Sequence, residues 1–397
     1  MEQVLSNLMS HHEDVCVSLL DAWPAAAEAL GGDALARLML ASLLRQHGPQ
    51  CDTQYMCCGG FATKLIEAPA AAKLSSSAVA DIIQATFARY SPERHRTCMC
   101  AVYLPQAQQL SCKVVGRLLH AAIQQRSSSS MLWLSCLPGM QQLSSSELFD
   151  LLQMAVQLSR DVWEADSCKW DSPKVDRYVK HLWVVPAAEE LTSNQVARLL
   201  QAATQLGSAG CVEILVRLPA AKQLDSGVVG PLLLAAMQQQ QQQQQQQLRS
   251  VPHLCRHLCS LPGAQQLSRD AVVHLLQTAI ANGRLNAVED ACKLPASREI
   301  SSEVLAQLVE AAVRQDKGGV GALCALPAAQ QLTSTFLMQL LQADMQQRGS
   351  NILDLCKLPG VQQLGRSPKG RQLLQAAEQQ QLCCRRCGRE NIICCSR

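Results

Sequence analysis

The sequence predicts an all-α fold, an α-solenoid of about ten two-helix repeats of about 33 residues each, and three observations favour it. A proline returns at this interval and precedes a short Ala/Gln segment, as in LPGAQQL from Leu261 and LPAAQQL from Leu326. An apolar pair follows each proline at a nearly fixed distance. Extra residues, where they occur, enter at a single place in the repeat. Such self-similarity is typical of stacked helical repeats. The repeat prolines are Pro24, Pro69, Pro105, Pro138, Pro186, Pro219, Pro262, Pro295, Pro327 and Pro359.

The residues after the proline segment predict the first helix of each repeat, which we call the A helix. Its apolar positions recur at i, i+3, i+4 and i+7, as in Val272, Leu275, Leu276 and Ala279. A capping side chain precedes it in the internal repeats, because Ser, Thr and Asp accept hydrogen bonds from the free N–H groups of a first turn. The expected caps are Ser75, Ser111, Ser144, Thr192, Asp225, Ser268, Ser301 and Thr333, with Gly31 and Gly365 in the two terminal repeats.

The second helix, which we call the B helix, is expected to end at the repeat proline. In the later repeats it closes as Leu-Cys-Ser-Leu before Pro262 and Leu-Cys-Lys-Leu before Pro359. Proline lacks an N–H and disfavours helical geometry in the residue before it, so the B helix should stop or kink there.

Three segments lengthen the repeat, and all lie between an A helix and its B helix. They are residues 47–60, residues 163–180 and the glutamine run 238–247, which we interpret as loop insertions at the hairpin turns. The glutamine run is alternatively a helix extension able to pair with other Gln-rich segments. Pro231 lies within the predicted A helix just before it, so this repeat should be the weakest in the stack. We predict one solenoid over residues 1–380 and a disordered Cys-rich tail over residues 381–397.

Composition restricts the class of protein. Hydrophobic residues make up 48% and aromatic residues 3% of the chain, which fits narrow contacts between Leu, Val and Ala helices. The net charge of +3 is too small to indicate a polyanionic partner. No apolar run is long enough for a membrane span, and the start MEQVLSNLMSHHEDV lacks the features of a secretory signal. We therefore expect an intracellular protein that does not engage a membrane, with the cytoplasm as the favoured compartment and the nucleus or an organelle as open alternatives.

Most of the 20 cysteines are expected to be reduced. Cys259, Cys292, Cys324 and Cys356 each stand three residues before a repeat proline, where Val102 stands in another repeat. A position shared by Cys and Val indicates packing of a small apolar side chain.

Two cysteine-containing segments resemble metal-ligand sets. In His253–Cys259, His253 and His257 have the i, i+4 spacing that can place two imidazoles on one zinc ion, but we favour structural histidines. In the tail, Cys384, Cys387, Cys394 and Cys395 could form a small zinc site, together with Cys383. Because Cys394 and Cys395 are adjacent, joint tetrahedral ligation is awkward, and we predict no bound metal or cofactor.

No catalytic pattern is found, and we predict that the chain is not an enzyme. The run Gly318-Gly319-Val320-Gly321 has neither a preceding strand nor a Lys-Ser/Thr, so we interpret it as a turn. The acids Asp161, Glu164, Asp166 and Asp171 lie in an insertion and are expected to be solvated.

Polar residues flanking the apolar pair of each A helix form the candidate binding face. The columns before and after the pair are three residues apart and should share one side of the helix. Glutamine dominates the second column, and a repeated polar position is how solenoids build extended binding surfaces. The selected residues are Arg117, Gln153, Arg198, Gln201, His274, Gln277, Gln307, Gln339 and Gln342.

The stretches Leu275–Ile300 and Leu199–Leu224 resemble an ankyrin repeat. They share a period of about 33 residues, an Ala-rich first helix, a Gly turn and a Val/Leu-rich second helix, whereas the TPLH opening and the β-turn of that family are missing. The resemblance implies a protein–protein interaction scaffold and transfers no contact residue.

An RNA-reading helical repeat similar to pentatricopeptide units is the alternative. Such proteins need contact columns that vary between repeats. The first column varies and the second hardly does, while aromatic residues are few and no basic stripe is present. We therefore favour a protein partner, with no prediction of oligomeric state.

Overall fold

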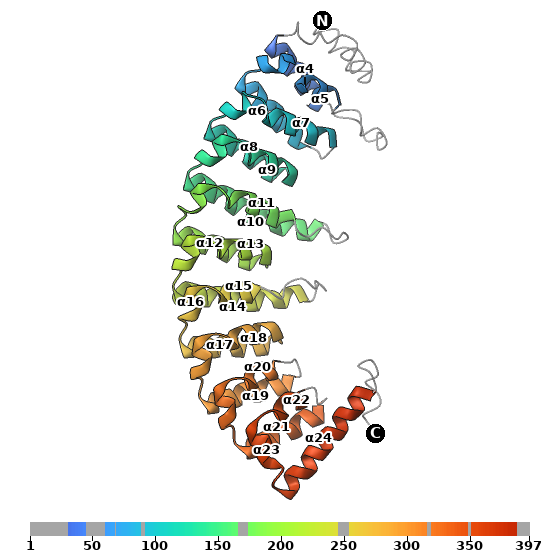
Figure 1. Ribbon diagram of the computed structural model, residues 1–397, viewed down its shortest axis with the longest axis vertical. Coiled ribbons are helices and arrows are strands. Elements are labelled where there is room, and N and C mark those ends of the chain that lie inside the picture. The colour runs from blue at the N-terminus through green and yellow to red at the C-terminus, as the bar shows by residue number, and fades with distance from the viewer. Residues whose placement is uncertain are drawn as a thin grey trace. The chain divides into compact units, whose positions relative to one another are not determined.

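The computed structural model describes residues 31–44, 60–67, 69–88, 92–165, 174–244, 254–315, 319–347 and 351–386. In this part of the chain the fold is all-α, with regularly spaced helix pairs and proline-initiated turns, as the sequence predicts (Figure 1). The chain divides into two compact units, Met1–Gln195 and Val196–Arg397. None of the described helices is long and apolar enough to cross a membrane.

In unit 1 the A helices and the B helices form two adjoining rows (Figure 1). The A helices are α4 (Gly32–Leu44), α6 (Ser76–Ala85), α8 (Cys112–Gln124) and α10 (Ser145–Ala165). The B helices are α5 (Gly60–Glu67), α7 (Pro92–Val102), α9 (Ser128–Leu134) and α11 (Lys174–Leu182), and a short 3₁₀ turn η2 (Thr86–Ala88) follows α6.

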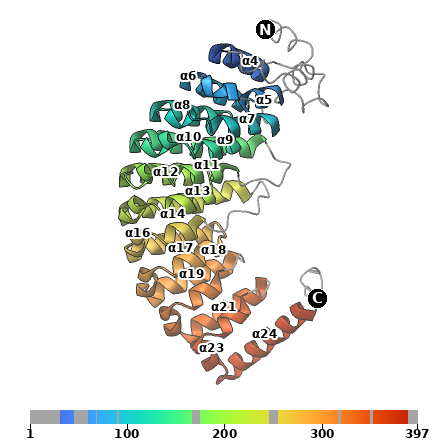
Figure 2. The same cartoon turned by 45° about the horizontal axis from the view of Figure 1, so that its top comes forward.

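Unit 2 repeats this arrangement (Figure 2). Its A helices are α12 (Ser193–Gln205, which begins just before the boundary), α14 (Ser226–Gln244), α17 (Arg269–Ala281), α19 (Ser302–Gln315), α21 (Ser334–Gln347) and α24 (Pro368–Arg386). Its B helices are α13 (Ala209–Leu215), α15 (Leu254–Cys259), α18 (Leu285–Cys292), α20 (Val320–Cys324) and α22 (Ile352–Cys356).

The B helices end just before the repeat proline, as predicted. The residue that precedes the proline is extended, with ψ between 133° at Leu137 and 145° at Leu326. The proline then starts a short helical turn, a third element that the sequence analysis did not anticipate. These proline turns are η1 (Pro69–Lys73), η3 (Ala107–Gln109, after Pro105), η4 (Pro138–Gln142), η5 (Pro186–Ala188), η6 (Pro219–Gln223), α16 (Pro262–Gln265), η7 (Pro295–Glu299), η8 (Pro327–Gln331) and α23 (Pro359–Leu364).

Most proline turns pack on the A helix of their own hairpin, and several also contact the proline turn of a neighbouring repeat, as η3 and η5 do with η4 and as η6 does with α16. A proline turn lies very close to the backbone of the preceding proline turn where glycine follows the proline. A Cβ atom at Gly139 would stand 2.6 Å from the carbonyl oxygen of Leu110, the residue that follows η3. Proline turns of several neighbouring repeats therefore lie side by side within each unit.

The predicted caps are largely confirmed. The hydroxyl of Ser75 accepts a hydrogen bond from the backbone N–H of Ala78, and that of Ser268 from Ala271. Ser144 and Glu147 form the expected capping box, in which Glu147 accepts from the Ser144 backbone N–H at 3.0 Å. These hydrogen bonds favour the carboxylate and lower the pKa of Glu147.

Thr192 and Gln195 form a second capping box, which the sequence analysis missed although the spacing is the same. Ser111 precedes α8 without a capping hydrogen bond from its side chain. The assignment of Gly365 as a cap is wrong, because Gly365 ends α23 and the Ser367 hydroxyl accepts from Gly370 N–H at the start of α24.

The hairpin insertions are partly helical. Residues 163–165 belong to α10 and residues 174–180 to α11, so this insertion lengthens both helices of its hairpin. The glutamine run begins as a continuation of α14 through Gln244 rather than as a loop, and this helix runs through Pro231. The remainder of that run and residues 47–59 lie outside the described residues. In the predicted tail, residues 381–386 continue α24.

Three hairpins share one way of ending the A helix. Arg126, Gly207 and Gly283 adopt the left-handed conformation, with φ of 56°, 68° and 64°. In each, the next residue donates its N–H to a carbonyl five positions back, as Ser208 does to Ala203 at 3.0 Å. This is the Schellman motif, which glycine fits without strain.

Arg126→Gly is expected to stabilise unit 1 by about 1 kcal/mol, because a side chain at left-handed φ carries a steric penalty that glycine lacks. Arg126→Ala is the matched control, since it removes the same guanidinium and keeps the Cβ. Urea denaturation followed by circular dichroism measures both variants. Equal stability of the Gly and Ala variants would contradict the assignment of strain.

Gly139→Ala should destabilise unit 1 by about 1–3 kcal/mol, because the new methyl group would overlap the Leu110 carbonyl and the Val115 side chain. Gly116→Ala, in the middle of α8, meets only a Leu143 methyl group at 3.6 Å. It should therefore stabilise by about 0.5–1 kcal/mol through helix propensity. Thermal unfolding of the two variants should give shifts of opposite sign, and a neutral Gly139→Ala would show that the proline turns are not tightly spaced.

Candidate binding surface

The selected polar residues lie on the side of the A helices that faces away from the core. In a typical A helix the residues four, seven, eight, eleven and twelve positions after the cap are buried, as Val272, Leu275, Leu276, Ala279 and Ile280 are after Ser268. The two columns stand six and nine positions after the cap, near the opposite side of a helix with 3.6 residues per turn. Of the nine residues selected from the sequence, eight are exposed and Gln153 is half-buried.

A third column completes this surface and was missed by the sequence analysis. Thirteen positions after the cap, four residues beyond the second column, the chain again places exposed glutamines. These glutamines could have been predicted from the sequence, because they lie one helical turn after the second column. They are Gln124, Gln157, Gln205, Gln238 and Gln346. We call the three columns together the outer A face.

Neutral amides give the outer A face its character. The charge of Arg314 is offset by Glu310, with 2.6 Å between the guanidinium and the carboxylate. In α14 the columns are interrupted by the exposed Pro231 and the half-buried Leu234. An amide side chain both donates and accepts hydrogen bonds, so such a surface can pair with polar backbone or side chains of a partner.

The cysteines that precede the repeat prolines pack within the row of B helices. Cys259 is buried, and Cys292, Cys324 and Cys356 are half-buried. Burial raises the pKa of the Cys292 and Cys324 thiols to about 12, so both stay protonated at neutral pH. This behaviour fits the predicted packing role.

The metal-ligand candidates are not brought together in the described structure. Cys255 and Cys259 are buried on α15, His257 is half-buried, and His253 lies outside the described residues. Cys384 is in α24, but nothing is described of its side chain, and Cys387, Cys394 and Cys395 lie outside the described residues. Within the described ranges, no group of three or more His, Cys, Asp or Glu side chains could hold a metal ion.

Two buried carboxylates have structural partners. Asp344 accepts hydrogen bonds from the backbone N–H and the side-chain amide of Asn351, at 3.1 and 2.9 Å, and thereby ties α21 to the start of α22. Asp290 pairs with Lys293 at 2.9 Å.

Gly319, in the glycine-rich run, has φ of 91° and immediately precedes α20, which agrees with a turn. Gly318 lies outside the described residues. Asp166 and Asp171 are also outside, and the side chains of Asp161 and Glu164 on α10 are not described.

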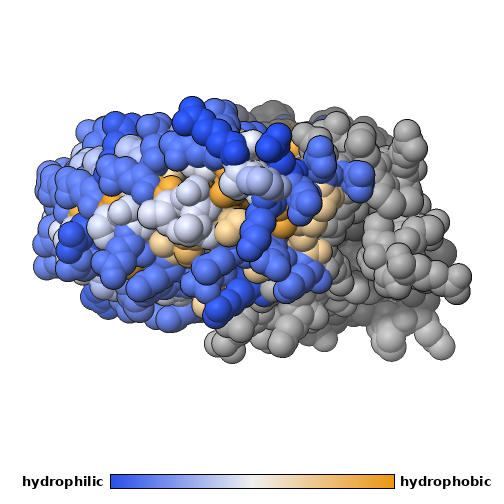
Figure 3. All heavy atoms as spheres, turned by 90° about the horizontal axis from the view of Figure 1, so that it is seen from below, coloured by the Kyte–Doolittle hydropathy of each residue, from blue (hydrophilic) through white to orange (hydrophobic). Residues whose placement is uncertain are grey.

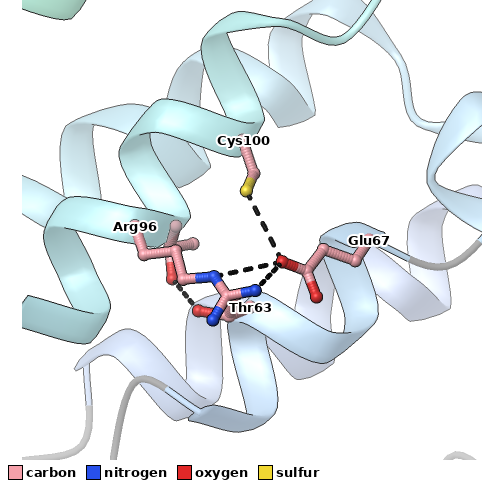
Figure 4. A network of polar contacts seen from close by, with 5 residues as sticks. Thr63, Glu67, Arg96 and Cys100 are labelled. Carbon is pink, nitrogen blue, oxygen red and sulfur yellow. Dashed lines mark hydrogen bonds and ion pairs between the residues drawn. The ribbon is translucent and has the colours of Figure 1, made fainter.

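A polar network joins the B helices α5 and α7 in unit 1 (Figure 4). Glu67 accepts hydrogen bonds from Arg96 Nε at 3.2 Å and Nη2 at 2.7 Å, and the Cys100 thiol points at the same carboxylate oxygen. The hydroxyls of Thr63 and Thr97 lie 2.8 Å apart beneath it. Burial, and then the Glu67 charge, raise the pKa of Cys100. The network holds the two helices together and partly neutralises Arg96.

At the far end of unit 2, α24 leaves apolar surface uncovered. Leu373 and Leu374 are half-buried, whereas the equivalent Leu340 and Leu341 of α21 are buried. Figure 3 views the molecule toward this end, and apolar groups show there between polar side chains.

No family model and no curated protein matches the chain. Among solved structures, it is similar to the crystal structure of an engineered protein from the Northeast Structural Genomics Consortium. The alignment has 10% identity, covers 96% of this chain and 98% of the other, and gives a TM-score of 0.31. At that score the likeness carries no argument about function.

Thiol labelling tests the packing role of the cysteines. With iodoacetamide at pH 8, the exposed Cys136 should react quickly, whereas the protonated Cys292 and Cys324 should stay unlabelled until the protein is unfolded. Peptide mapping by mass spectrometry reads each site separately. Labelling of Cys292 at the rate of Cys136 in the folded protein would contradict this role.

Proposed function

We propose that this chain is a non-catalytic scaffold that binds protein partners through the outer A face. The observation that carries the proposal is the exposure of polar residues, mostly glutamine, at the same three positions of successive A helices. Solenoids use side chains repeated at a constant interval to contact an extended partner. Within each unit, contacts between neighbouring proline turns support that interval.

The chemistry of the outer A face favours a protein partner. Glutamine amides can bond to the peptide groups of an extended or helical segment, and they carry no charge that would attract phosphates. The likeness of period and helix pattern to ankyrin repeats supports the same class of function, and we propose an ankyrin-like scaffold without transferring any contact residue.

RNA binding is the second candidate, because the first column varies between repeats. Arg117, Asp150, Arg198, His274 and Gln307 occupy equivalent exposed positions. A base-reading repeat protein needs this kind of variation. The second column, which is glutamine in six of ten repeats, argues against a code that uses both positions.

Substitution of the outer A face separates these candidates. Gln277→Ala, Gln307→Ala and Gln342→Ala in one variant remove three amides from α17, α19 and α21. Alanine preserves the helices because it has the highest helix propensity. The matched control replaces Gln266, Gln330 and Gln362, which are exposed in or beside the proline turns.

Tagged full-length protein and both variants are used for affinity capture from native lysate, with and without RNase. Partners that withstand RNase and about 0.5 M salt should be captured with the unsubstituted protein and the control, and be reduced at least about tenfold with the face variant. Partners lost on RNase treatment, or captured equally by the face variant, would overturn the proposal.

A further inference from the structure

Just past the ends of three B helices of unit 1 stand exposed apolar residues that neither the core nor the outer A face explains. Tyr103, Cys136 and Val184 all stand two residues before a repeat proline, in successive repeats. Tyr103 is 60% exposed and Val184 is 59% exposed. The same position holds Glu67 in the repeat of unit 1 that ends at Pro69, and in unit 2 it holds Arg217, Ser260, Lys293, Ala325 and Lys357. The repeat therefore does not require an apolar residue at this position.

Aromatic contact links two of these repeats. The rings of Tyr103 and Trp133 meet edge to face, with centroids 6.4 Å apart and planes at 67°. Trp133 lies on α9, and Cys136 follows in the turn after this helix, where its backbone N–H donates to the Trp133 carbonyl at 3.0 Å. Leu132 beside it is 44% exposed. We call Tyr103, Leu132, Trp133, Cys136 and Val184 the B-helix patch.

The B-helix patch spans neighbouring elements of one unit. Helix α9 packs against α7 on one side and against α11 on the other. Single exposed apolar residues are common on soluble proteins, but a cluster with aromatic members is typical of interaction sites. Tyr and Trp are also the side chains that most often carry the binding energy of protein interfaces.

Positive charge adjoins the B-helix patch. Arg177 and Lys180 are exposed on α11, three residues apart and thus on one side of this helix, which ends at Leu182, two residues before Val184. Glu67 on α5 is paired with Arg96 at 2.7 Å, and Glu189 and Glu190 are exposed beyond Pro186. Arg177 and Lys180 therefore supply positive charge on α11, the helix that ends just before Val184.

We propose that the B-helix patch docks a peptide segment of a protein partner in which acidic residues flank a bulky apolar side chain. The apolar anchor contacts Tyr103, Trp133 and Val184, and the carboxylates face Arg177 and Lys180. This site is separate from the outer A face and does not depend on the function proposed for it.

The geometry favours a peptide over single-stranded nucleic acid. Bases stack on the open faces of aromatic rings. The rings of Tyr103 and Trp133 pack edge to face against each other, and Trp133 is half-buried, so they offer less free ring face to a base. Leu132 and Val184 supply aliphatic contact area, which suits an apolar side chain of a peptide.

The probe is a phage-displayed library of random 12-residue peptides, selected on the full-length protein. Selected sequences should be enriched in Asp or Glu around Leu, Phe or Trp. Their synthetic counterparts should bind Tyr103→Ala/Trp133→Ala, and separately Arg177→Glu/Lys180→Glu, at least about tenfold more weakly than the unsubstituted protein. Val184→Asp provides a further variant at an exposed position that should repel the acidic peptide without disturbing the core.

Leu353→Ala is the matched apolar control, because Leu353 is 47% exposed on a B helix of unit 2. It should keep full peptide binding, as should the Gln277/Gln307/Gln342 variant of the outer A face. Circular dichroism checks that each variant is folded. The proposal would be overturned by failure to enrich any sequence, by equal binding to Val184→Asp, or by full displacement of the peptide by an oligouridine.

Discussion

The rest of the structure depends on the backbone constraint that proline imposes where each B helix ends. The residue before the proline is forced into an extended conformation, and the proline itself has no N–H to continue a helix. The chain therefore leaves the B helix at one place, makes a short turn and enters the next A helix at a nearly fixed register. Because successive proline turns contact one another, as Gly139 contacts Leu110, this local constraint also sets the distance between repeats.

A fixed entry register determines which side chains reach solvent. The positions six, nine and thirteen residues after the cap always lie away from the core, which places glutamine in rows on the outer A face. The same reasoning applies to the B helices, where the residue two positions before the proline is exposed in both units. Unit 1 uses that position for Tyr103 and Val184, and unit 2 for Arg217 and Lys293. The two units thus share a backbone plan and differ in the side chains that their B helices present.

Local rules were enough to predict the helix pairs, most caps and the stop before each proline. The capping side chain, the apolar pair and the proline all lie within one repeat and act over a few residues. Three features needed knowledge of the packing. The helical proline turns depend on contacts between repeats, the cap at Ser367 replaces Gly365 because the last proline segment is longer, and the B-helix patch is recognised only when buried and exposed sides of α9 are known. The third glutamine column needed no such knowledge, since one further helical turn of counting would have placed Gln205 and Gln346.

The continuation of α14 into the glutamine run has a consequence for length variation. Each added helical residue extends a helix by about 1.5 Å and rotates the direction of its far end by about 100°. The glutamines form the C-terminal end of α14, which points toward the hairpin turn. A change in the number of helical glutamines would therefore change the length of α14 and the direction in which the chain leaves it. The spacing of the proline turns would be unaffected, because they contact the opposite end of the A helix. The glutamine tract can therefore vary in length without changing the packing of the proline turns.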